Sequence, residues 1–421
     1  MRVLVIGSGG REHALAWRLA HDGADVLVAP GNDGIADEHA CAALDVRDAP
    51  AVLELVRRHR SELCVIGPEQ PLVDGLADAL RAGGVPCFGP SAAAARLEGS
   101  KVDAKAFMRA HGIPTARAEV VHDRATLTAA LARFDAPPVV KADGLAAGKG
   151  VVVAESFEEA EAAARRCLEE RIFGTAGAQV VLEQRLTGQE VSLFVVTDGE
   201  HAQIMAPAQD HKRIGDGDTG PNTGGMGAYV PAPVFTPNVR ARALSQVVAP
   251  TLAGLRAQGR PFVGVVFVGL MIDRDEQPWV IEYNVRFGDP EAQALSWGLD
   301  APLLPALHAA ATGGLVDGEL PTRPAATVVL AAAGYPGEPR RGDPITGLAA
   351  AGADPRVKIF HAGTRRQGDG FVTHGGRVLG VCAREHTLQA ALAAAYRAVD
   401  GVHFDGMQVR RDVGARALVP A

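Results

Sequence analysis

An acid and an amide, Glu282 and Asn284, lie two positions apart in an apolar segment of the last third of the chain. In an extended strand alternate side chains share a face, so these two oxygen-bearing side chains point one way and Ile281, Tyr283 and Val285 point the other. Mg²⁺ prefers oxygen ligands and typically takes only one or two protein carboxylates beside phosphates and water. The pair therefore predicts a magnesium site. The alternative is a strand face that only meets solvent.

A lysine and three glycines suggest a phosphate-binding loop in the first half of the chain. Lys141 ends the predicted strand 139–141, and Gly144, Gly148 and Gly150 make the following turn pliable. Such a backbone can fold over a polyphosphate with a lysine at its base. The loop is not a Walker A motif, because no G-K-[ST] opens a helix here. A plain β-hairpin with a surface lysine is the alternative.

A glycine turn, Gly7 to Gly10, follows the first predicted strand and opens a helix. Glu12 stands where the dinucleotide fingerprint G-x-G-x-x-G needs its third glycine. The turn still offers free N–H groups to one phosphate, with Arg11 as a second contact. Glu69 follows another strand and reaches the carboxyl edge of the same sheet, where ligands of open α/β sheets bind. These features predict a phosphosugar site, and a tight turn without a ligand is the alternative.

The segment 209–228 is rich in glycine and has no apolar periodicity. Segments of this kind are uncommon inside a compact domain and are usually functional when ordered. Charged side chains cluster in it: Asp210, Lys212, Arg213, Asp216 and Asp218. A mere spacer has no need of them. We therefore predict a functional segment, with a flexible linker as the alternative.

The elements that must position these residues fall into three regions, and the fold class is multidomain α/β and α+β. Residues 1–100 alternate buried strands with helices, which predicts a doubly wound parallel sheet. The predicted elements are strands 3–6, 26–29 and 63–66 and helices 11–20, 51–59 and 72–82. Residues 101–324 form a central region with a small lid lobe at about 118–187.

Residues 325–421 are expected to form a small α+β domain. The predicted elements are strands 327–331, 357–360 and 371–381 and a helix at 387–399. The glycine pair 375–376 between apolar stretches predicts a hairpin turn within 371–381.

Composition excludes several classes of protein. The chain has 421 residues, 47% of them hydrophobic and 22% charged, as in ordinary globular proteins rather than disordered ones. A net charge of −7 argues against a nucleic-acid partner, which needs a basic surface. The five cysteines show no C-x-x-C pair and suggest a reducing cytoplasm. No apolar run is long enough for a membrane span or a signal peptide, so we expect no membrane partner.

Taken together, these segments resemble the phosphoribosylamine-glycine ligase (glycinamide ribonucleotide synthetase) family of ATP-grasp enzymes. The resemblance runs along the whole chain and rests most on these motifs: VLVIGSGGREHALAW, GPEQPLV, LEGSK, VVKADGLAAGKGV, QDHKR, GPNTGGMGAY, NVRFGDPE and GGRVLGV. It implies an N-terminal phosphoribosylamine-binding domain, central ATP-grasp lobes and a C-terminal domain that closes the site. It also implies a monomeric enzyme of de novo purine biosynthesis that joins glycine to 5-phosphoribosylamine. ATP is converted to ADP and phosphate through a glycyl phosphate, with Mg²⁺ or Mn²⁺ as the metal.

The resemblance also implies a role for individual residues. Those expected to bind ATP are Lys101, Lys141, Gly148, Glu183, Leu186, Glu190 and Asn222. Glu282 and Asn284 match the metal pair. Arg286 is expected to stabilise phosphoryl transfer, while Asp210, Lys212 and Asp289 position glycine or its acyl phosphate. The residues assigned to the phosphosugar are Gly10, Arg11, Glu12 and Glu69.

One strand of the sequence departs from the pattern of many ATP-grasp enzymes. Many ATP-grasp enzymes carry another carboxylate on the strand before the Glu-x-Asn pair. Val268-Gly269-Leu270 occupies that strand here, so we expect few protein ligands to the metal.

Three alternative functions remain open at this point. A nicotinamide-dependent dehydrogenase is disfavoured by Glu12. A non-catalytic relic is disfavoured by the intact Lys141, Glu282 and Arg286. A ligase for a different phosphoribosyl intermediate is the nearest rival.

Overall fold

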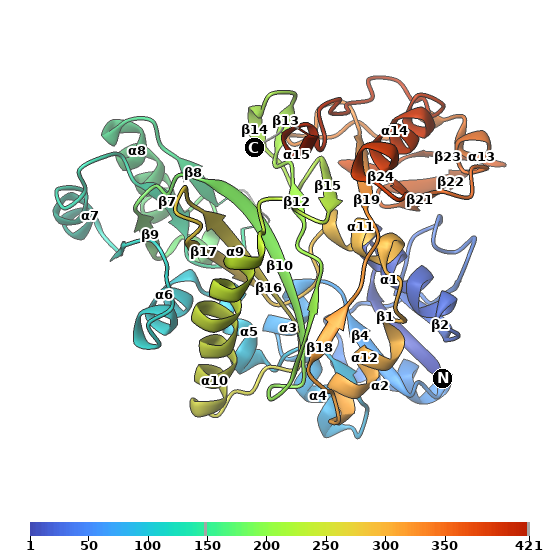
Figure 1. The fold of residues 1–421 in the computed structure, drawn as a ribbon, viewed down its shortest axis with the longest axis horizontal. Helices are drawn as coiled ribbons and strands as arrows, with labels where there is room; N and C mark the ends of the chain where they lie inside the picture. The colour runs from blue at the N-terminus through green and yellow to red at the C-terminus, as the bar shows by residue number, and fades with distance from the viewer. Residues whose placement is uncertain (147–149, 419–421) are drawn as a thin grey trace.

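The structure is a computed structural model that describes residues 1–146 and 150–418. Figure 1 shows a central sheet with a projecting lobe on its left and the N-terminal and C-terminal regions on its right. No helix in these described ranges is long and apolar enough to cross a membrane.

The N-terminal sheet is wholly parallel, with strand order β3-β2-β1-β4-β5. Its strands are β1 (Arg2–Gly7), β2 (Asp25–Pro30), β3 (Ala40–Cys41), β4 (Leu63–Ile66) and β5 (Cys87–Phe88). The helices of this region are α1 (Gly10–His21), α2 (Ala49–His59), α3 (Glu69–Val73), α4 (Leu76–Ala82) and α5 (Ala92–Gly99). Val3 to Ile6 are fully buried because both sheet faces are covered. The predicted doubly wound sheet is confirmed.

One predicted helix of this region is wrong. The apolar pattern predicted a single helix at 72–82, but α3 ends at Val73 and α4 begins at Leu76. Gly75 between them has φ +89°, a left-handed conformation that a continuous helix cannot contain.

The projecting lobe has a four-stranded antiparallel sheet of order β6-β9-β7-β8 (Figure 1, left). It follows α6 (Lys101–Ala110) and contains β6 (Ala118–Val121), α7 (Arg124–Leu131), β7 (Val139–Ala142), β8 (Val151–Val153), α8 (Phe157–Leu168), a 3₁₀ turn (Gly174–Gly177) and β9 (Val180–Glu183). A separate hydrophobic cluster around Val121, Leu127 and Leu182 holds it together. The predicted strand 139–141 is confirmed as β7, whereas the glycine turn that follows it lies partly outside the described residues.

The central sheet has the order β17-β16-β10-β11-β18. Its strands are β10 (Gln189–Thr197), β11 (Ala202–Met205), β16 (Gly264–Ile272), β17 (Pro278–Asn284) and β18 (Gly318–Leu320). The accompanying helices are α9 (Pro237–Ala243), a π-helical turn (Leu244–Val248), α10 (Ala249–Ala257), α11 (Glu291–Gly298) and α12 (Leu304–Thr312). All neighbours are antiparallel except β11 and β18, which are parallel.

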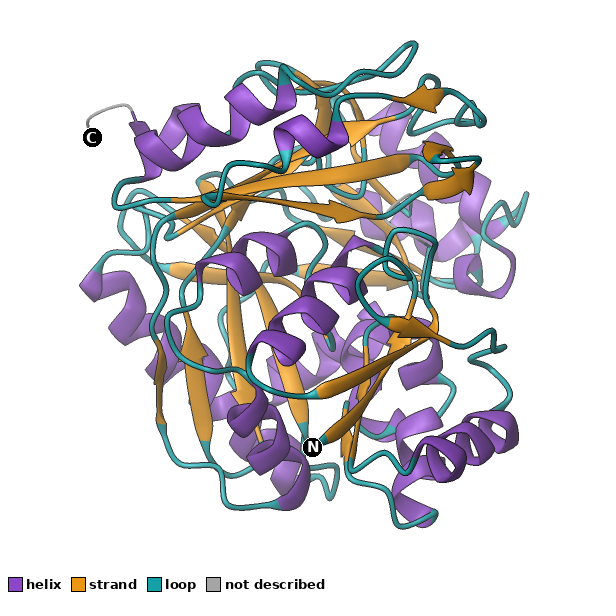
Figure 2. Cartoon of the chain, turned by 90° about the vertical axis from the view of Figure 1, so that its right-hand side faces the viewer, coloured by secondary structure: helices purple, strands orange, loops and turns teal. Residues whose placement is uncertain are grey.

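The third large sheet combines strands from two parts of the chain, in the order β12-β15-β19-β24-β21. Strands β12 (Gln209–Asp210) and β15 (Gly227–Val230) join β19 (Ala325–Ala331), β21 (Val357–His361) and β24 (Arg377–Arg384). Helix α14 (Leu388–Val399) covers one face, and α11 lies between the other face and α1 (Figure 2). The segment 209–228 is therefore folded and is not a linker. The boundaries predicted at residues 100 and 324 stay predictions.

A smaller sheet of order β20-β23-β22 lies beside this one. The remaining elements are β13 (Arg213–Gly215), β14 (Thr219–Asn222), β20 (Pro344–Ile345), α13 (Leu348–Ala351), β22 (Thr364–Gln367), β23 (Gly370–Thr373) and α15 (Ala415–Leu418). The hairpin predicted at 371–381 is wrong, because β23 pairs with β22 and β20 whereas β24 pairs with β19 and β21. The glycine pair 375–376 instead connects two different sheets.

Candidate active site

Lys141 is fixed at the base of the projecting lobe by a buried ion pair. It lies on β7, and its Nζ is 3.0 Å from Oε2 of Glu183 on the neighbouring strand β9. The same amine donates to the carbonyl of Ile281 on β17, at 3.1 Å. Both charged side chains are only 5% exposed. Lys141 therefore connects the projecting lobe to the central sheet, and its two partners fix the orientation of its side chain.

A second amine shares the same carboxylate oxygen. Nζ of Lys105 lies 3.0 Å from Oε2 of Glu183 and donates to Thr115 at 2.7 Å. Sequence reasoning missed Lys105. Its spacing of four residues from Lys101 places both on one face of α6, and this was the signal that could have found it.

Lys101 begins α6 and reaches back to the base of the lobe. Its Nζ donates to the carbonyl of Gly144 at 3.2 Å. Asp143 accepts the N–H of Val102 at 2.8 Å, which holds the start of the helix against the loop. Burial and the neighbouring Lys141 lower the pKa of Lys101, although Glu282 opposes that shift. Lys101 and Lys141 therefore contribute positive charge to one enclosed region.

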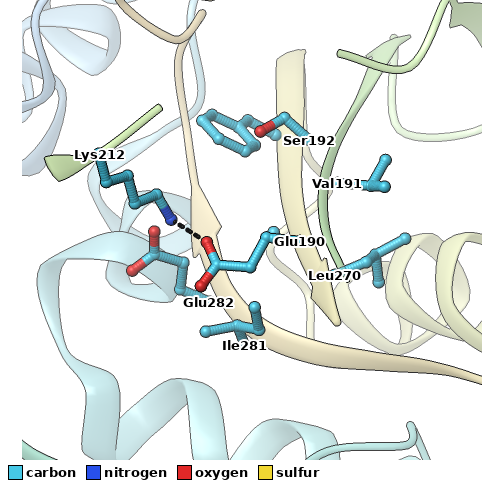
Figure 3. Close-up of a pocket in the computed structure, with 9 residues that line it drawn as sticks. Glu190, Val191, Ser192, Lys212, Leu270, Ile281 and Glu282 are labelled. Carbon is cyan, nitrogen blue, oxygen red and sulfur yellow. Dashed lines mark hydrogen bonds and ion pairs between the residues drawn. The ribbon is translucent and has the colours of Figure 1, made fainter. Parts of the chain in front are cut away.

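Glu282 lines a cavity on the central sheet together with Glu190, Ser192 and Lys212. Figure 3 shows the carboxylates of Glu190 and Glu282 and the amine of Lys212 pointing toward one another. Lys212 Nζ is 2.7 Å from Oε2 of Glu190. Burial works against the charge of Glu282, but the surrounding cations hold its pKa below the usual value; they are Lys212, Lys141, Lys101 and Arg286. An ionised carboxylate surrounded by cations suits a metal ion bound with phosphates.

A β-bulge changes the strand faces that simple alternation predicts. Gly269 pairs with Glu282, but the next residue, Leu270, pairs with Val280, so Ile281 is the extra residue. Ile281 consequently lines the cavity beside Glu282 instead of joining the buried face, and this part of the prediction is wrong. Tyr283 is buried in the core as expected, and Asn284 is half-buried at the strand end, opposite Phe267.

Arg286 connects β17 to the N-terminal region. Its Nε is 3.2 Å from Glu69 and its Nη2 is 3.0 Å from Glu98. Glu98 also accepts the N–H of Val285 at 2.8 Å. Burial disfavours the charged guanidinium, but Glu98 and Glu69 raise the pKa of Arg286. Sequence reasoning did not single out Glu98, whose distance of almost 190 positions from Arg286 leaves no local signal.

The residues predicted for a phosphosugar do meet at the N-terminal glycine turn. Oε2 of Glu12 accepts the N–H of Gly9 at 2.6 Å, and Oε1 is 2.5 Å from Nε of Arg11. A Cβ added to Gly67 would lie 2.1 Å from Glu12. The side chain of Glu12 therefore fills the space next to Gly9 and Gly67, so a side chain at either glycine would collide with it.

Arg11 and Gly10 connect this turn to the central region. Nη1 of Arg11 donates to the carbonyl of Phe287 at 3.2 Å and lies 3.9 Å from Glu69. A Cβ added to Gly10 would lie 2.6 Å from the side chain of Gln293 on α11. The glycine turn is therefore in close contact with the segment that follows β17.

Two further acids adjoin the cavity. Burial raises the pKa of Asp210 on β12, with Glu190 and Glu282 acting in the same direction. Burial and then Asp210 raise the pKa of Glu291 to about 7, and Ser192 donates to its Oε1 at 3.3 Å. The sequence patterns assigned Glu291 no role, although it is the last residue of the motif NVRFGDPE.

Some predicted residues lie apart from this cluster. Asn222 is exposed on the hairpin β13–β14, opposite Arg213. Leu186 is half-buried shortly after β9. Gly148 lies outside the described residues. Asp289 does not line the cavity of Glu282: it is half-buried between Arg377 of the C-terminal region and Gly9 of the N-terminal turn.

Three family models match successive parts of the chain, and all three describe phosphoribosylglycinamide synthetase. The N domain matches residues 1–98, the ATP-grasp (A) domain residues 99–292 and the C domain residues 325–416. The chain belongs to the phosphoribosylglycinamide synthetase family. It is accordingly an ATP-dependent ligase of the ATP-grasp class, acting in purine biosynthesis. Enzymes of this class use ATP with Mg²⁺ or Mn²⁺.

Individual members of the phosphoribosylglycinamide synthetase family match over their whole length. The phosphoribosylamine–glycine ligase of Chlorobaculum tepidum is 50% identical, over 99% of this chain and all of that protein. The ligase of Vibrio cholerae is 48% identical over 99% of both. The crystal structure of the Thermotoga maritima phosphoribosylamine–glycine ligase is 35% identical, with a TM-score of 0.87 over 98% of this chain and 100% of that one.

More distant structures share the fold of this family. The biotin carboxylase of Campylobacter jejuni gives a TM-score of 0.74 at 14% identity, over 97% of this chain and 92% of that one. At this identity the likeness concerns the fold alone.

Proposed function

We propose that this enzyme joins glycine to 5-phosphoribosylamine and forms glycinamide ribonucleotide, ADP and phosphate. The names of full-length relatives at about 50% identity support these substrates. The observation that carries the proposal is the ionised Glu282 in a cavity beside Lys212, with Lys101, Lys141 and Arg286 lowering its pKa. Such a concentration of cations favours a polyphosphate.

The chemistry needs activation because a carboxylate is a poor electrophile. The glycine carboxylate oxygen attacks the γ-phosphorus of ATP, ADP leaves, and a glycyl phosphate forms. The amine nitrogen of phosphoribosylamine then attacks the glycyl carbon, phosphate leaves with the C–O bond electrons, and the nitrogen loses a proton. The protein contributes mainly position and charge to both steps.

ATP would lie between the projecting lobe and the central sheet. Lys101 on α6 and Lys141 on β7 would contact its phosphates, and their burial near the base of the projecting lobe supports this placement. Glu183 to Leu186 would form the hinge whose backbone meets adenine, and Glu190 would contact the ribose. The resemblance to the family also suggests ATP contacts for Asn222 and Gly148.

The residues around Glu282 fit a Mg²⁺ or Mn²⁺ ion. Glu282 and the amide oxygen of Asn284 would hold it, because an ionised carboxylate and one neutral oxygen leave positions for phosphates and water. When bound, the ion would neutralise phosphate charge during transfer. The absence of another acid at Gly269 agrees with a site dominated by substrate oxygens.

The remaining residues divide according to the substrate that they would contact. Arg286 would stabilise the transferring phosphoryl group, while Asp210, Lys212 and Asp289 position glycine or its acyl phosphate. The phosphosugar would lie against the N-terminal turn, with these contacts: Gly10, Arg11, Glu12 and Glu69. The close approach of Arg11 to Phe287 and Glu69 supports a site shared by the two regions.

Phosphate release tests the proposal directly. Full release from ATP should require glycine and phosphoribosylamine together, and glycine alone should support no sustained turnover. Turnover with a different amino acid or another phosphoribosyl intermediate, but none with this pair, would support the rival ligase instead. We also expect a monomer in the cytoplasm, where the five unpaired cysteines would stay reduced. Size measurement in solution checks the monomer.

A further inference from the structure

Arg377 reaches from the C-terminal sheet into two loops of the central region. It is the first residue of β24, and its Nη1 donates to the carbonyl oxygens of Gly224 and Asp289, both at 2.6 Å. The same nitrogen is 3.5 Å from Oδ1 of Asp289. One guanidinium therefore joins the loop Thr223–Met226 to the turn that follows β17.

The loop Thr223–Met226 is shaped to receive this side chain. A Cβ added to Gly224 would lie 3.0 Å from Cζ of Arg377, so any larger residue would push the guanidinium away. The N–H of Gly224 donates to the hydroxyl of Tyr335 at 2.8 Å, which is a second contact from the C-terminal region. These contacts fix the loop from two sides.

Asp289 is held by Arg377 on one side and faces the N-terminal turn on the other. Gln293 donates to its Oδ1 at 2.8 Å. A Cβ added to Gly9 would be 3.6 Å from Oδ2 of Asp289 and 2.9 Å from Glu12. Despite burial, Arg377 and Arg11 hold the pKa of Asp289 below its usual value.

We infer that Arg377 is a positioning residue for the reaction, which orients Asp289 and the loop 223–226 at the place where the glycyl phosphate meets the phosphosugar amine. This inference rests on the proposed function. It gives the C-terminal region a specific part in the chemistry: Arg377 couples the placement of that region to the geometry of a carboxylate between the N-terminal turn and α11. A residue that only docked the C-terminal region would not need to contact both loops.

Arg384 provides a matched control at the other end of the same strand. It also donates to a backbone carbonyl of the central region, that of Trp297 at 3.2 Å, and its guanidinium lies 4.7 Å from the Trp297 ring centroid. It has no contact with Asp289 or with the loop Thr223–Met226 among the described residues. If β24 arginines serve only to dock the C-terminal region, Arg377→Ala and Arg384→Ala should affect turnover alike.

The experiment measures kcat and the KM of each substrate for the full-length enzyme. In Arg377→Ala, kcat/KM for phosphoribosylamine should fall roughly 10- to 100-fold, the usual consequence of losing charged hydrogen bonds. The KM for ATP should stay within about twofold, because Arg377 contacts none of the proposed ATP-binding residues that the structure describes. Arg377→Lys should recover part of the loss, and Arg384→Ala should resemble the wild type in kcat/KM.

The pH profile separates positioning from a structural effect. Removing Arg377 raises the pKa of Asp289, so the acid limb of kcat/KM for the amine should move to higher pH in Arg377→Ala. Arg11, Glu12 and Gln293 also face Asp289 and are unchanged in this variant. An unmoved acid limb, or an equal loss in Arg384→Ala, would overturn the inference. Failure of the wild type to use glycine with phosphoribosylamine would instead overturn the proposed function.

Discussion

Two glutamates near lysines, the buried Glu183 and the half-buried Glu282, differ in their ion pairing, and this difference separates a residue that stabilises the fold from one that can bind a ligand. Glu183 has two lysine amines at 3.0 Å from one oxygen, so its charge is neutralised within the protein. Glu282 has no cation within 4.0 Å among the described residues, although four more distant cations lower its pKa. An acid that is already paired stabilises the fold, whereas an ionised acid without a close partner is available to a ligand.

The largest expected effect is on turnover, in Glu282→Gln. This variant keeps the shape of the side chain but removes the charge that would hold the metal, so turnover at limiting Mg²⁺ should fall on the order of 100-fold or more. The free energy of unfolding should fall less than in Glu183→Gln, because no cation lies within 4.0 Å of Glu282 among the described residues. Activity titrated with Mg²⁺ and denaturant unfolding measure the two quantities. Full activity at limiting Mg²⁺ would remove the distinction between the two glutamates.

Glu183→Gln should show the opposite pattern, with the larger loss in stability. It leaves Lys105 and Lys141 buried without a counter-charge, and breaking such a pair costs about 3–5 kcal/mol. Urea unfolding compared with Glu282→Gln measures the difference. If both variants are equally stable, the ion pair at the base of the lobe does not act as we describe.

Lys141→Ala tests both glutamates at once, because Lys141 pairs with Glu183 and also lowers the pKa of Glu282. Lys105 still neutralises Glu183 in this variant, so the stability loss should be smaller than in Glu183→Gln. The KM for ATP should rise roughly 10- to 100-fold through loss of a charged phosphate contact. An ATP titration of initial rates checks this, with Lys358→Ala, on β21 at the N-terminal interface, as a control lysine. An unchanged ATP titration would exclude Lys141 from the nucleotide site.

Glu291 gives the smallest effect and represents a third kind of buried acid, without a close cation among the described residues. Its pKa of about 7 lies above the ordinary value, so the folded state retains a proton that the unfolded state loses. Stability should therefore fall by about 1–3 kcal/mol as pH rises from about 4.5 to 7. Glu291→Gln should flatten this slope, measured by unfolding at several pH values. A parallel slope in both proteins would contradict the assignment.

Local patterns predicted most of the fold. Buried runs such as Val3 to Ile6 and the alternation around Glu282 and Tyr283 identify strands because burial follows from side-chain periodicity. The bulge at Ile281 and the separate sheets on either side of Gly375 could not be predicted in this way. Both depend on which strand lies next to which, and that information is not local.

The candidate site was predicted in its residue types but not in its pairings. Lys141, Glu282 and Arg286 were identified from motifs. The ion-pair partners of the two cations, Glu183 for Lys141 and Glu69 and Glu98 for Arg286, come from distant segments. Glu183 was expected near adenine, and nothing local showed that its carboxylate would join two lysines. Family resemblance supplies roles, whereas only three-dimensional packing shows which charges meet.

The sheet β12-β15-β19-β24-β21 contains strands from the middle and from the end of the chain, so the C-terminal region cannot be cut away without breaking it. Strand β15 pairs with β19, so a protein truncated before residue 325 would present β15 as an unprotected edge, with Tyr229 and Val230 newly exposed to water. Open edges of this kind favour aggregation. A grafted or separately expressed C-terminal lobe would thus need residues 209–230 supplied with it.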